Sequence, residues 1–293
     1  MKKKILITGK GSYISINFKK WIQKWPDLYD VDELSVRGSE WEKCNFSKYD
    51  VILHTAAIVH QNNKRISKDT YYEVNCDLAV KVAKKAKLEK CKQFIFLSTM
   101  SVYGLEGEIN KKIIIDENTE CNPITYYGKS KLMAEGKLNQ LSCDNFKVAV
   151  HRPPMVYGDG CKGNYQKLKK IIRIPFLPDL SNQRSMISID NLCEFIRQTI
   201  DNQSAGLFFP QDEKYSSTKE ILIELAKKEG VKIKFTTILN PLVKLASLCK
   251  INAVNKMYGN LIYAKSTFPL FQSNSNNNKN YEVTNIEKHN DYS

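Results

Sequence analysis

Near its start the chain reads Lys4-Ile5-Leu6-Ile7-Thr8-Gly9-Lys10-Gly11-Ser12-Tyr13-Ile14-Ser15. Lys4 to Thr8 is a short, mostly apolar run with β-branched residues, which is typical of a buried parallel strand. A turn of small residues follows at once, and residues 16–25 have the spacing of an amphipathic helix. This succession of strand, small-residue turn and helix is the context that a phosphate-binding loop requires.

The turn itself supplies residues that suit this role. Gly9 permits a tight turn, and Gly11 or Ser12 lets backbone N–H groups approach a pyrophosphate at the positive end of the helix. Ser15 stands where the usual fingerprint has a third glycine for packing between helix and strand. The turn therefore indicates either a dinucleotide-binding loop or an ordinary connection between a strand and a helix.

A second strand is expected from Val31 to Arg37. In a unit that binds NAD, an acidic residue near the end of this strand holds the 2′-hydroxyl of the adenosine ribose. Here an arginine, Arg37, occupies the expected place of that acid. Arg37 is therefore a candidate partner for the 2′-phosphate of NADP, or it is a solvated loop residue.

Three further apolar segments alternate with segments of helical spacing and predict a doubly wound parallel α/β sheet of five strands. They cover residues 49–57, 93–98 and 145–151. Ligands of such sheets bind at the carboxyl ends of the strands. The residues expected there are the small Thr55, Ala56 and Ala57, the hydroxyl-bearing Ser98, Thr99 and Ser101, and His54, which we interpret as a packed core residue rather than a base.

The segment Tyr126-Tyr127-Gly128-Lys129-Ser130-Lys131 follows Pro123 and is expected to open a helix. Tyr127 and Lys131 are four residues apart, so their side chains share one helix face. An ammonium group near a phenol stabilises the phenolate and lowers its pKa from about 10 towards neutral pH. A tyrosine tuned in this way can exchange a proton with a sugar hydroxyl, which is general acid–base catalysis. Taken alone, the same spacing also occurs on ordinary solvated helices.

The composition is that of a folded chain with a basic surface. The 293 residues are 42% hydrophobic and 10% aromatic, with a formal net charge of +14. No run approaches the ~20 apolar residues needed to cross a bilayer, and the apolar run near the start is too short for a signal peptide. The eight cysteines are scattered, which predicts reduced thiols, cytoplasmic localisation and no metal site.

The basic charge favours anionic ligands or surfaces, such as phosphate groups, nucleic acid or acidic lipid headgroups. The lysines are dispersed and no nucleic-acid-binding motif accompanies them, so we expect no nucleic-acid partner. The alternative is a lysine-rich composition without functional meaning.

We expect a dinucleotide-binding domain over residues 1–158, to which later segments return, and a smaller α/β substrate-binding part over residues 159–293. A capping box at Ser217 and Glu220 predicts the start of a helix in the second part. From Pro241 to Cys249, apolar residues lie on one helix face and lysines on another. This pattern indicates either contact with a membrane surface or a helix packed on its own domain. The tail from about residue 273 is of low complexity.

Four motifs occur together in one order: the glycine turn, His54-Thr55-Ala56-Ala57, Ser98-Thr99-Met100-Ser101-Val102-Tyr103-Gly104, and Tyr127-Gly128-Lys129-Ser130-Lys131. Together they resemble the extended short-chain dehydrogenase/reductases, within the NAD-dependent epimerase/dehydratase family, and especially its members similar to UDP-glucose 4-epimerase from bacterial surface-polysaccharide pathways. The resemblance covers about residues 3–210. It implies a Rossmann fold, NAD or NADP as cofactor, a nucleotide-diphosphate sugar as substrate, and a homodimer.

The resemblance also implies roles for single residues. Tyr127 and Lys131 match the catalytic Tyr-Lys pair of the family, and Thr99 matches its catalytic hydroxyl residue. Besides Gly9, Gly11 and Arg37, the implied cofactor contacts are Ser12, Tyr13, Ile14, Asn45, Phe46, Thr55, Ala56, Ala57, Ser98, Tyr127, Lys131 and Pro154. The implied substrate contacts are Thr99, Ser101, Tyr127, Asn164 and Arg184. Ser12 and Ser15 depart from the glycines of the family.

The implied reaction inverts a sugar at C4. Tyr127 would remove the proton of the C4 hydroxyl while hydride passes to the nicotinamide, and hydride would return to the other face of the resulting 4-keto sugar. Thr99 would hold the reacting oxygen, and Lys131 would tune Tyr127 and bond the nicotinamide ribose. Two alternatives stay open. One is an NADPH-dependent reductase of a nucleotide-linked 4-keto-6-deoxy sugar, which Arg37 favours, and the other is a non-catalytic NAD(P)-sensing protein.

Overall fold

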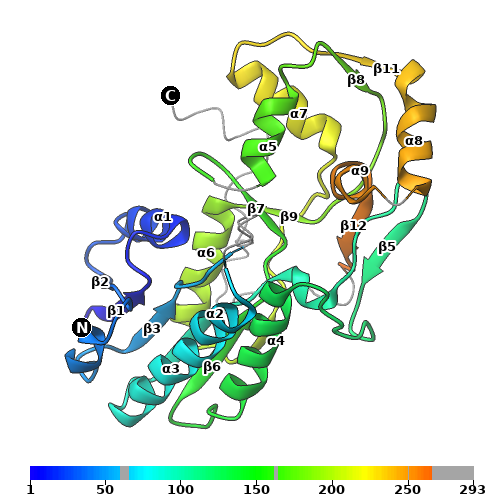
Figure 1. Ribbon diagram of the computed structural model, residues 1–293. Coiled ribbons are helices and arrows are strands. Elements are labelled where there is room, and N and C mark those ends of the chain that lie inside the picture. Colours follow the sequence, from blue (N-terminus) through cyan, green and yellow to red (C-terminus); the bar gives the residue numbers. More distant parts are fainter. Residues whose placement is uncertain (60–65, 162–163, 250, 266–293) are drawn as a thin grey trace.

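A six-stranded parallel sheet forms the centre of the molecule, with the strand order β10-β6-β4-β3-β1-β2 (Figure 1). The computed structural model describes residues 1–59, 66–161, 164–249 and 251–265, so the predicted tail from residue 273 lies outside them. The strands are β1 (Lys3–Thr8), β2 (Tyr29–Leu34), β3 (Val51–His54), β4 (Gln93–Leu97), β6 (Lys147–His151) and β10 (Gly206–Phe208). Because β1 lies between β2 and β3, the strand order changes direction there, which is where doubly wound sheets bind ligands.

Helices cover both faces of this sheet (Figure 1). Helices α1 (Tyr13–Ile22) and α6 (Ile189–Asp201) pack on one face, and α2 (Lys68–Tyr72), α3 (Leu78–Leu88) and α4 (Tyr126–Asn139) lie on the other. Side chains alternate along β1, so that Ile5 and Ile7 enter the first core while Leu6 enters the second. The predicted doubly wound α/β class is confirmed.

The sequence missed strand β10, because it has three residues of which Gly206 and Leu207 are exposed. The strand pairs in parallel with β6, and helix α6 comes just before it. Residues 189–208 therefore return to the sheet from the second half of the chain. The exact boundary at residue 158 remains a prediction.

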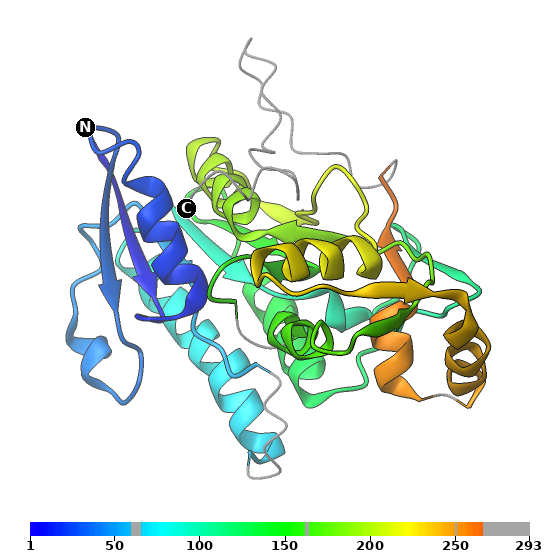
Figure 2. The same cartoon turned by 90° about the horizontal axis from the view of Figure 1, so that it is seen from above.

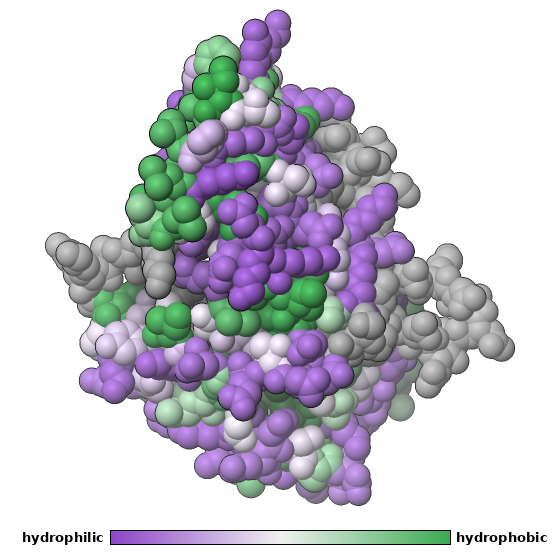
Figure 3. Space-filling model, turned by 90° about the vertical axis from the view of Figure 1, so that its right-hand side faces the viewer, coloured by the Kyte–Doolittle hydropathy of each residue, from purple (hydrophilic) through white to green (hydrophobic). Residues whose placement is uncertain are grey.

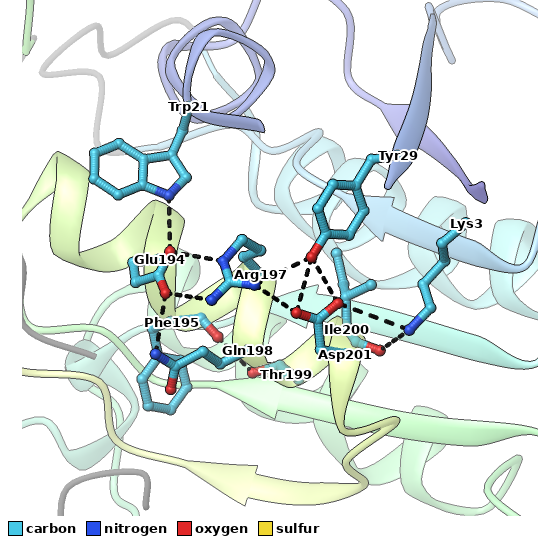
Figure 4. A network of polar contacts seen from close by, with 10 residues as sticks. All are labelled: Lys3, Trp21, Tyr29, Glu194, Phe195, Arg197, Gln198, Thr199, Ile200 and Asp201. Carbon is cyan, nitrogen blue, oxygen red and sulfur yellow. Dashed lines mark hydrogen bonds and ion pairs between the residues drawn. The ribbon is translucent and has the colours of Figure 1, made fainter. Parts of the chain in front are cut away.

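A hydrogen-bond network fixes this returning segment to the start of the chain (Figure 4). Glu194 accepts a hydrogen bond from the Trp21 indole at 3.0 Å and from Arg197 Nε at 2.8 Å. Two turns after Glu194 on α6, the Asp201 carboxylate accepts from the Tyr29 hydroxyl at 2.7 Å. Burial and the Asp201 carboxylate raise the pKa of Tyr29 to about 12. The phenol therefore stays protonated, and it serves as a structural donor between β2 and α6.

A single turn of π-helix, Glu73–Asp77, separates α2 from α3. It carries Asn75, whose side-chain carbonyl accepts from the Ile58 N–H at 2.8 Å and whose amide donates to the Ile58 carbonyl at 3.0 Å. The same amide donates to the Ser130 hydroxyl on α4 at 3.1 Å. Isolated π turns are frequent at functional sites. Here the turn links the segment after β3 to the helix that carries Tyr127 and Lys131.

The rest of the described chain forms a region of short elements beside the sheet. Its parallel strand pairs are β5 (Lys112–Ile115) with β12 (Asn260–Tyr263), β7 (Met155–Tyr157) with β9 (Met186–Ser188), and β8 (Phe176–Pro178) with β11 (Lys234–Thr236). Its helices are α5 (Asn164–Ile171), α7 (Thr218–Lys228), α8 (Asn240–Leu248) and α9 (Asn252–Tyr258). The capping box predicted at Ser217 and Glu220 opens α7. Helix α8 lies at the opposite end of the molecule from β2 (Figure 2).

All eight cysteines are free thiols. Within the described ranges, no helix is both long enough and apolar enough to cross a membrane.

Candidate active site

The loop after β1 has the shape of a dinucleotide cradle. Gly9 has a φ of +122°, and a Cβ at this position would stand 2.5 Å from the Ala56 nitrogen and 2.6 Å from Thr55 Oγ1. Only glycine therefore allows the ends of β1 and β3 to meet this closely. The sequence predicted Gly9, Thr55 and Ala56 as cofactor contacts from separate motifs, and the structure brings the three together.

The two serines that replace glycines in the loop are both held by hydrogen bonds. Ser12 caps helix α1 by accepting from the Ser15 N–H at 3.1 Å, and its hydroxyl donates to Thr55 Oγ1 at 2.9 Å. The first turn of α1 contains no acidic residue, so its positive end is not neutralised from within the helix. The departures from the family's glycines thus keep a helix N-terminus that suits a phosphate group.

Strand β2 carries an acidic residue near its end, which the sequence analysis missed. The strand ends at Leu34 rather than Arg37, and Glu33 turns its carboxylate towards the loop. This carboxylate accepts from the Ser15 hydroxyl at 2.5 Å and from the Gly11 N–H at 3.4 Å, and Lys19 lies 3.3 Å away. The Ser15 hydrogen bond is the main cause that lowers the pKa of Glu33, so the group is a carboxylate at neutral pH. Arg37 lies beyond the strand in an exposed bend.

The other residues predicted near the cofactor differ in their exposure. Tyr13 and Ile14, at the start of α1, are half-buried against the first core. Asn45 is exposed and accepts from the Ser47 N–H at 2.8 Å. Phe46 is fully buried in the second core, and its backbone N–H donates to Glu89 while its carbonyl accepts from the Tyr49 N–H, so its contact with a cofactor remains a prediction. Ala57 is half-buried and Pro154 is buried, and their contacts with a cofactor remain predictions.

The three predicted catalytic residues come from two adjoining elements. Thr99 caps the 3-10 helix η3 (Met100–Tyr103) by accepting from the Ser101 N–H at 3.1 Å. Tyr127 lies in the first turn of α4, and it forms a hydrogen bond with Thr99 that lowers its pKa. A Cβ on Gly128 would stand 2.7 Å from the Ser101 carbonyl. The missing side chain of Gly128 therefore allows α4 to approach η3 closely enough for Tyr127 to reach Thr99.

The electrostatics of this corner differ from the sequence-based expectation. Burial raises the pKa of Tyr127 to about 12, and the hydrogen bond with Thr99 opposes the rise only in part. Burial lowers the pKa of Lys131 to about 7, although the Glu135 carboxylate opposes this change. The described structure thus does not show the expected fall in the Tyr127 pKa, and the tuning role of Lys131 remains a prediction. The sequence spacing placed the two groups on one face but could not show how deeply both are buried.

Lys131 donates to the Leu97 carbonyl at 2.7 Å, and its ammonium nitrogen lies 4.4 Å from the centre of the Phe96 ring. Both partners belong to β4, so the side chain is held against the end of the central sheet.

A buried ion pair between Arg152 and Glu135 lies next to this corner, and the sequence analysis did not predict it. Arg152, just after β6, donates to Glu135 at 2.6 Å through Nη2 and at 3.1 Å through Nε. Arg152 also donates to the Tyr103 hydroxyl at 2.9 Å, and Ser98 donates to the Glu135 carboxylate. Ser98, predicted as a cofactor contact, thus belongs to this network. No spacing in the sequence points to this pair, because Glu135 and Arg152 are seventeen residues apart.

His54, at the end of β3, is a packed core residue as predicted. Its Nδ1 lies 2.8 Å from the Thr8 hydroxyl, and its ring stacks against Phe94 and Phe96. Burial, with the nearby Lys131 charge, lowers the pKa of His54 to about 3. The ring is therefore neutral at physiological pH and is not a proton acceptor there.

The predicted substrate contacts beyond the sheet lie in the region of short elements. Arg184 donates from Nη1 to the Gly259 carbonyl at 3.0 Å, and burial lowers the pKa of its guanidinium. Asn164 begins helix α5, and its side chain lies outside the described part of the structure. Ser101 is half-buried beside Thr99. The structure therefore brings Ser101 to the catalytic corner, whereas the roles of Arg184 and Asn164 remain predictions.

The chain is similar to proteins of known activity. A model of the NAD dependent epimerase/dehydratase family matches residues 27–207. A UDP-glucose 4-epimerase from Vibrio cholerae is 32% identical over 254 residues, which cover 77% of this chain and 76% of that protein. An N-acetyl-alpha-D-glucosaminyl-diphospho-ditrans,octacis-undecaprenol 4-epimerase from Escherichia coli O157:H7 is 29% identical over 187 residues, covering 61% and 55% of the two chains.

Solved structures share the fold. A UDP-glucuronic acid 4-epimerase from Bacillus cereus in complex with NAD has a TM-score of 0.66 at 18% identity, covering 93% of this chain and 94% of the other. A dTDP-4-dehydrorhamnose reductase from Bacillus anthracis in complex with NADP has a TM-score of 0.62 at 17% identity, covering 80% and 83%. One neighbour thus holds NAD and the other NADP, which are the two cofactors that the sequence predicted.

Proposed function

The chain belongs to the NAD-dependent epimerase/dehydratase family, and on this premise we propose that it inverts C4 of a sugar carried on a diphosphate, with NAD as cofactor. The observation that carries the proposal is the corner where the half-buried Thr99 meets the buried Tyr127 and Lys131, at the sheet edge that also bears the Gly9 loop. The hydrogen bond between Thr99 and Tyr127 gives a proton-transfer group beside a hydroxyl that can orient a sugar oxygen.

The residues around the loop fit a dinucleotide. Gly9 lets the ends of β1 and β3 meet at the loop, and the N-terminus of α1, whose first turn holds no acidic residue, suits a pyrophosphate. NAD, when bound, supplies the acceptance and return of hydride at its nicotinamide. Glu33 would accept from the 2′-hydroxyl of the adenosine ribose, while Thr55 and Ala56 would line the cofactor.

Tyr127 would move the proton of the C4 hydroxyl. With a pKa of about 12 the phenol is protonated at neutral pH, so it is first of all a proton donor. To accept a proton it needs a nearby positive charge, and Lys131, whose pKa is about 7, can supply that charge in its protonated form. Thr99 would hold the reacting oxygen in reach of the phenol, and burial of the corner excludes water from it.

The main rival is an NADPH-dependent ketoreductase on the same fold. The sequence favoured it through Arg37 and through an apparent lack of an acid on the second strand. Glu33 removes the second reason, because a carboxylate held at the loop repels a 2′-phosphate. NAD with reversible epimerisation is therefore better supported than NADPH with reduction. An intact Thr99, Tyr127 and Lys131 set also favours an enzyme over a non-catalytic sensor of NAD(P).

Two carriers of the sugar are compatible with this site. One is a nucleotide diphosphate, as the name of the Vibrio cholerae relative indicates, and the other is a polyprenyl diphosphate, as the name of the Escherichia coli relative indicates. Both carriers present a diphosphate, and the forked guanidinium of Arg184 suits that group. We propose Arg184 as the diphosphate contact for either carrier.

The test begins with purified protein that is denatured to release bound cofactor. We expect NAD in the supernatant, and we expect C4 epimers when the protein is incubated with UDP-glucose, UDP-N-acetylglucosamine or a polyprenyl-diphosphate N-acetylglucosamine. Tyr127→Phe should lower turnover by about 10²- to 10⁴-fold. Tyr126→Phe is the matched control, since this neighbouring tyrosine is exposed and should leave turnover unchanged. Consumption of NADPH with a 4-keto-6-deoxy sugar, and no epimer from any substrate, would establish the reductase instead.

The role of Glu33 has its own test. Glu33→Gln should weaken NAD binding by roughly fivefold, which corresponds to about 1 kcal/mol for one hydrogen bond to ribose, and should improve NADP binding. Arg37→Gln should change neither affinity, because its side chain lies in an exposed bend. Titration of NAD and NADP into the two variants shows which of the two residues selects the cofactor. A larger loss of NADP binding in Arg37→Gln than in Glu33→Gln would contradict the assignment.

A further inference from the structure

Among the described residues, helix α8 is fixed to the protein by one side only. On its inner side the Asn240 amide donates to the Asp179 carbonyl at 2.8 Å, and the Ser247 hydroxyl donates to Asn255 at 2.5 Å. Val243, between them in the sequence, packs against the small apolar cluster around Tyr258. These contacts orient the helix, so its opposite side must face outward.

The outward side of α8 is apolar. Leu242, Leu245 and Leu248 on α8, and Ile238 in the 3-10 turn just before it (Thr237–Leu239), are 60 to 83% exposed, and α8 has no buried residue. The molecular face that carries α8 shows a band of apolar surface beside a wide hydrophilic area (Figure 3). Of the two interpretations that the sequence left open, a helix whose apolar face packs on its own domain does not fit the described structure. We call Ile238, Leu242, Leu245 and Leu248 the α8 patch.

The stretch of sequence that contains the α8 patch carries charge of one sign. From Gly230 to Tyr281 the sequence contains no aspartate or glutamate, but it contains seven lysines, at positions 232, 234, 244, 250, 256, 265 and 279. Lys244 lies on α8 itself and is exposed, as are Lys232 and Lys234 before it. Two acidic side chains near this end of the molecule are paired with lysines, Asp179 with Lys219 at 2.6 Å and Glu106 with Lys256 of α9 at 3.0 Å. The surroundings of the α8 patch therefore attract anions.

We propose that α8 docks on an anionic lipid membrane, with the α8 patch inserted among the lipid headgroups and chains and Lys232, Lys234 and Lys244 at the headgroup level. An amphipathic helix with exposed leucines and a basic border has the features of helices that lie in a membrane interface. A basic segment close to the surface gains further affinity from anionic lipids. The absence of acidic residues over these fifty positions favours a lipid surface, because anionic lipids repel acidic groups. A protein partner or a second copy would not require it.

The docking would place a predicted substrate contact near the lipid surface. Helix α8 packs on α9, which ends next to Gly259, and the Gly259 carbonyl accepts a hydrogen bond from Arg184. A diphosphate that is attached to a membrane lipid lies at the headgroup level. The docking proposal itself does not depend on the proposed reaction, because binding to vesicles is measured without substrate.

The experiment is co-sedimentation of the full chain with vesicles at low salt. We expect binding to vesicles rich in phosphatidylglycerol and little binding to phosphatidylcholine alone. Leu242→Ser/Leu245→Ser should weaken the binding by about tenfold or more. Leu88→Ser is the control, since Leu88 at the end of α3 is even more exposed, and it should bind as the wild type does. Circular dichroism shows that each variant is folded.

A second set of variants separates insertion from simple charge attraction. Lys232→Gln/Lys234→Gln/Lys244→Gln should weaken binding more than Lys81→Gln/Lys84→Gln/Lys90→Gln, which removes the same charge from exposed sites on and after α3. Three results would overturn the proposal: no binding of the wild type to anionic vesicles, equal losses in the two lysine sets, or unchanged binding of the double serine variant. If light scattering shows that the serine variant instead loses self-association, the α8 patch binds a second copy.

Discussion

Two regions of this protein reverse the usual distribution of polar and apolar groups, and they do so in opposite directions. In the catalytic corner and next to it, Lys131, Glu135 and Arg152 are charged or titratable groups inside the protein. On α8, at the far end of the molecule, leucines stand in the solvent. Burial of charge and exposure of leucine are both unfavourable unless something compensates for them.

The compensation differs between the two regions. The buried charges are satisfied within the chain, because Arg152 and Glu135 pair with each other and with Tyr103 and Ser98. The α8 leucines have no such internal partner in the described structure, so compensation has to come from outside the molecule. The first region should therefore respond strongly to substitutions in the isolated protein. The second should respond only when its external partner is present.

The largest effect should follow from breaking the buried ion pair. Arg152→Met leaves the Glu135 carboxylate buried without its partner, which should lower the free energy of unfolding by about 3–5 kcal/mol. Lys43→Met is the control, because the Lys43–Glu40 pair is exposed and should contribute less than about 1 kcal/mol. Urea unfolding of both variants measures the difference. Equal effects would show that the pair next to the catalytic corner is no more important than a surface pair.

A smaller effect is expected where α4 approaches η3. A Cβ on residue 128 meets the Ser101 carbonyl at 2.7 Å, so Gly128→Ala must shift the helix and should cost about 1–3 kcal/mol. Because the shift moves Tyr127, turnover should also fall, by up to roughly 10²-fold. Gly136→Ala, two turns later on α4, meets no atom within 4 Å and should stabilise the protein by about 0.5–1 kcal/mol. If the free energy of unfolding falls in Gly128→Ala and rises in Gly136→Ala, the close approach of α4 to η3, and not helix propensity, explains the glycine at position 128.

The sequence predicted the parts of this site that depend on local pattern. Gly9 with its strand and helix, and the spacing of Tyr127 and Lys131, are visible within ten residues of chain. Glu33 was missed because the strand was expected to run to Arg37, and an error of three residues at a strand end puts the wrong side chain at the loop.

Features that depend on tertiary structure could not be predicted from local sequence patterns. Arg152 and Glu135 are brought together by the meeting of β6 and α4, and no local pattern specifies that pair. The direction of the pKa shift of Tyr127 depends on burial, which spacing does not show. The amphipathic pattern of α8 was visible, but only the structure shows that its apolar side faces outward.

The burial of Lys131 predicts a pH dependence of stability. Its pKa falls from 10.5 in the unfolded chain to about 7 in the folded protein. Between these values the unfolded chain binds more protons, so the contribution of Lys131 to stability rises with pH, by at most about 1.4 kcal/mol per pH unit. Below pH 7 both states are protonated and the contribution is constant. Lys131→Met removes this pH-dependent contribution. The free energy of unfolding of the wild type should therefore rise relative to that of the variant from pH 7 to pH 9. A difference that does not change with pH would mean that Lys131 keeps its ordinary pKa.

The smallest effect should come from the α8 patch in the absence of lipid. Leu245 is exposed and makes few contacts that serine would lose, so Leu245→Ser should change the free energy of unfolding by less than about 0.5 kcal/mol. Leu138→Ser, in the second core, should cost several times more, since it removes buried apolar area and places a hydroxyl there. With anionic vesicles present, the wild type should gain resistance to thermal unfolding that Leu245→Ser lacks, because a ligand that binds only the folded state stabilises it. A large loss of stability in Leu245→Ser without lipid would instead show that the α8 leucines already have a partner within the protein.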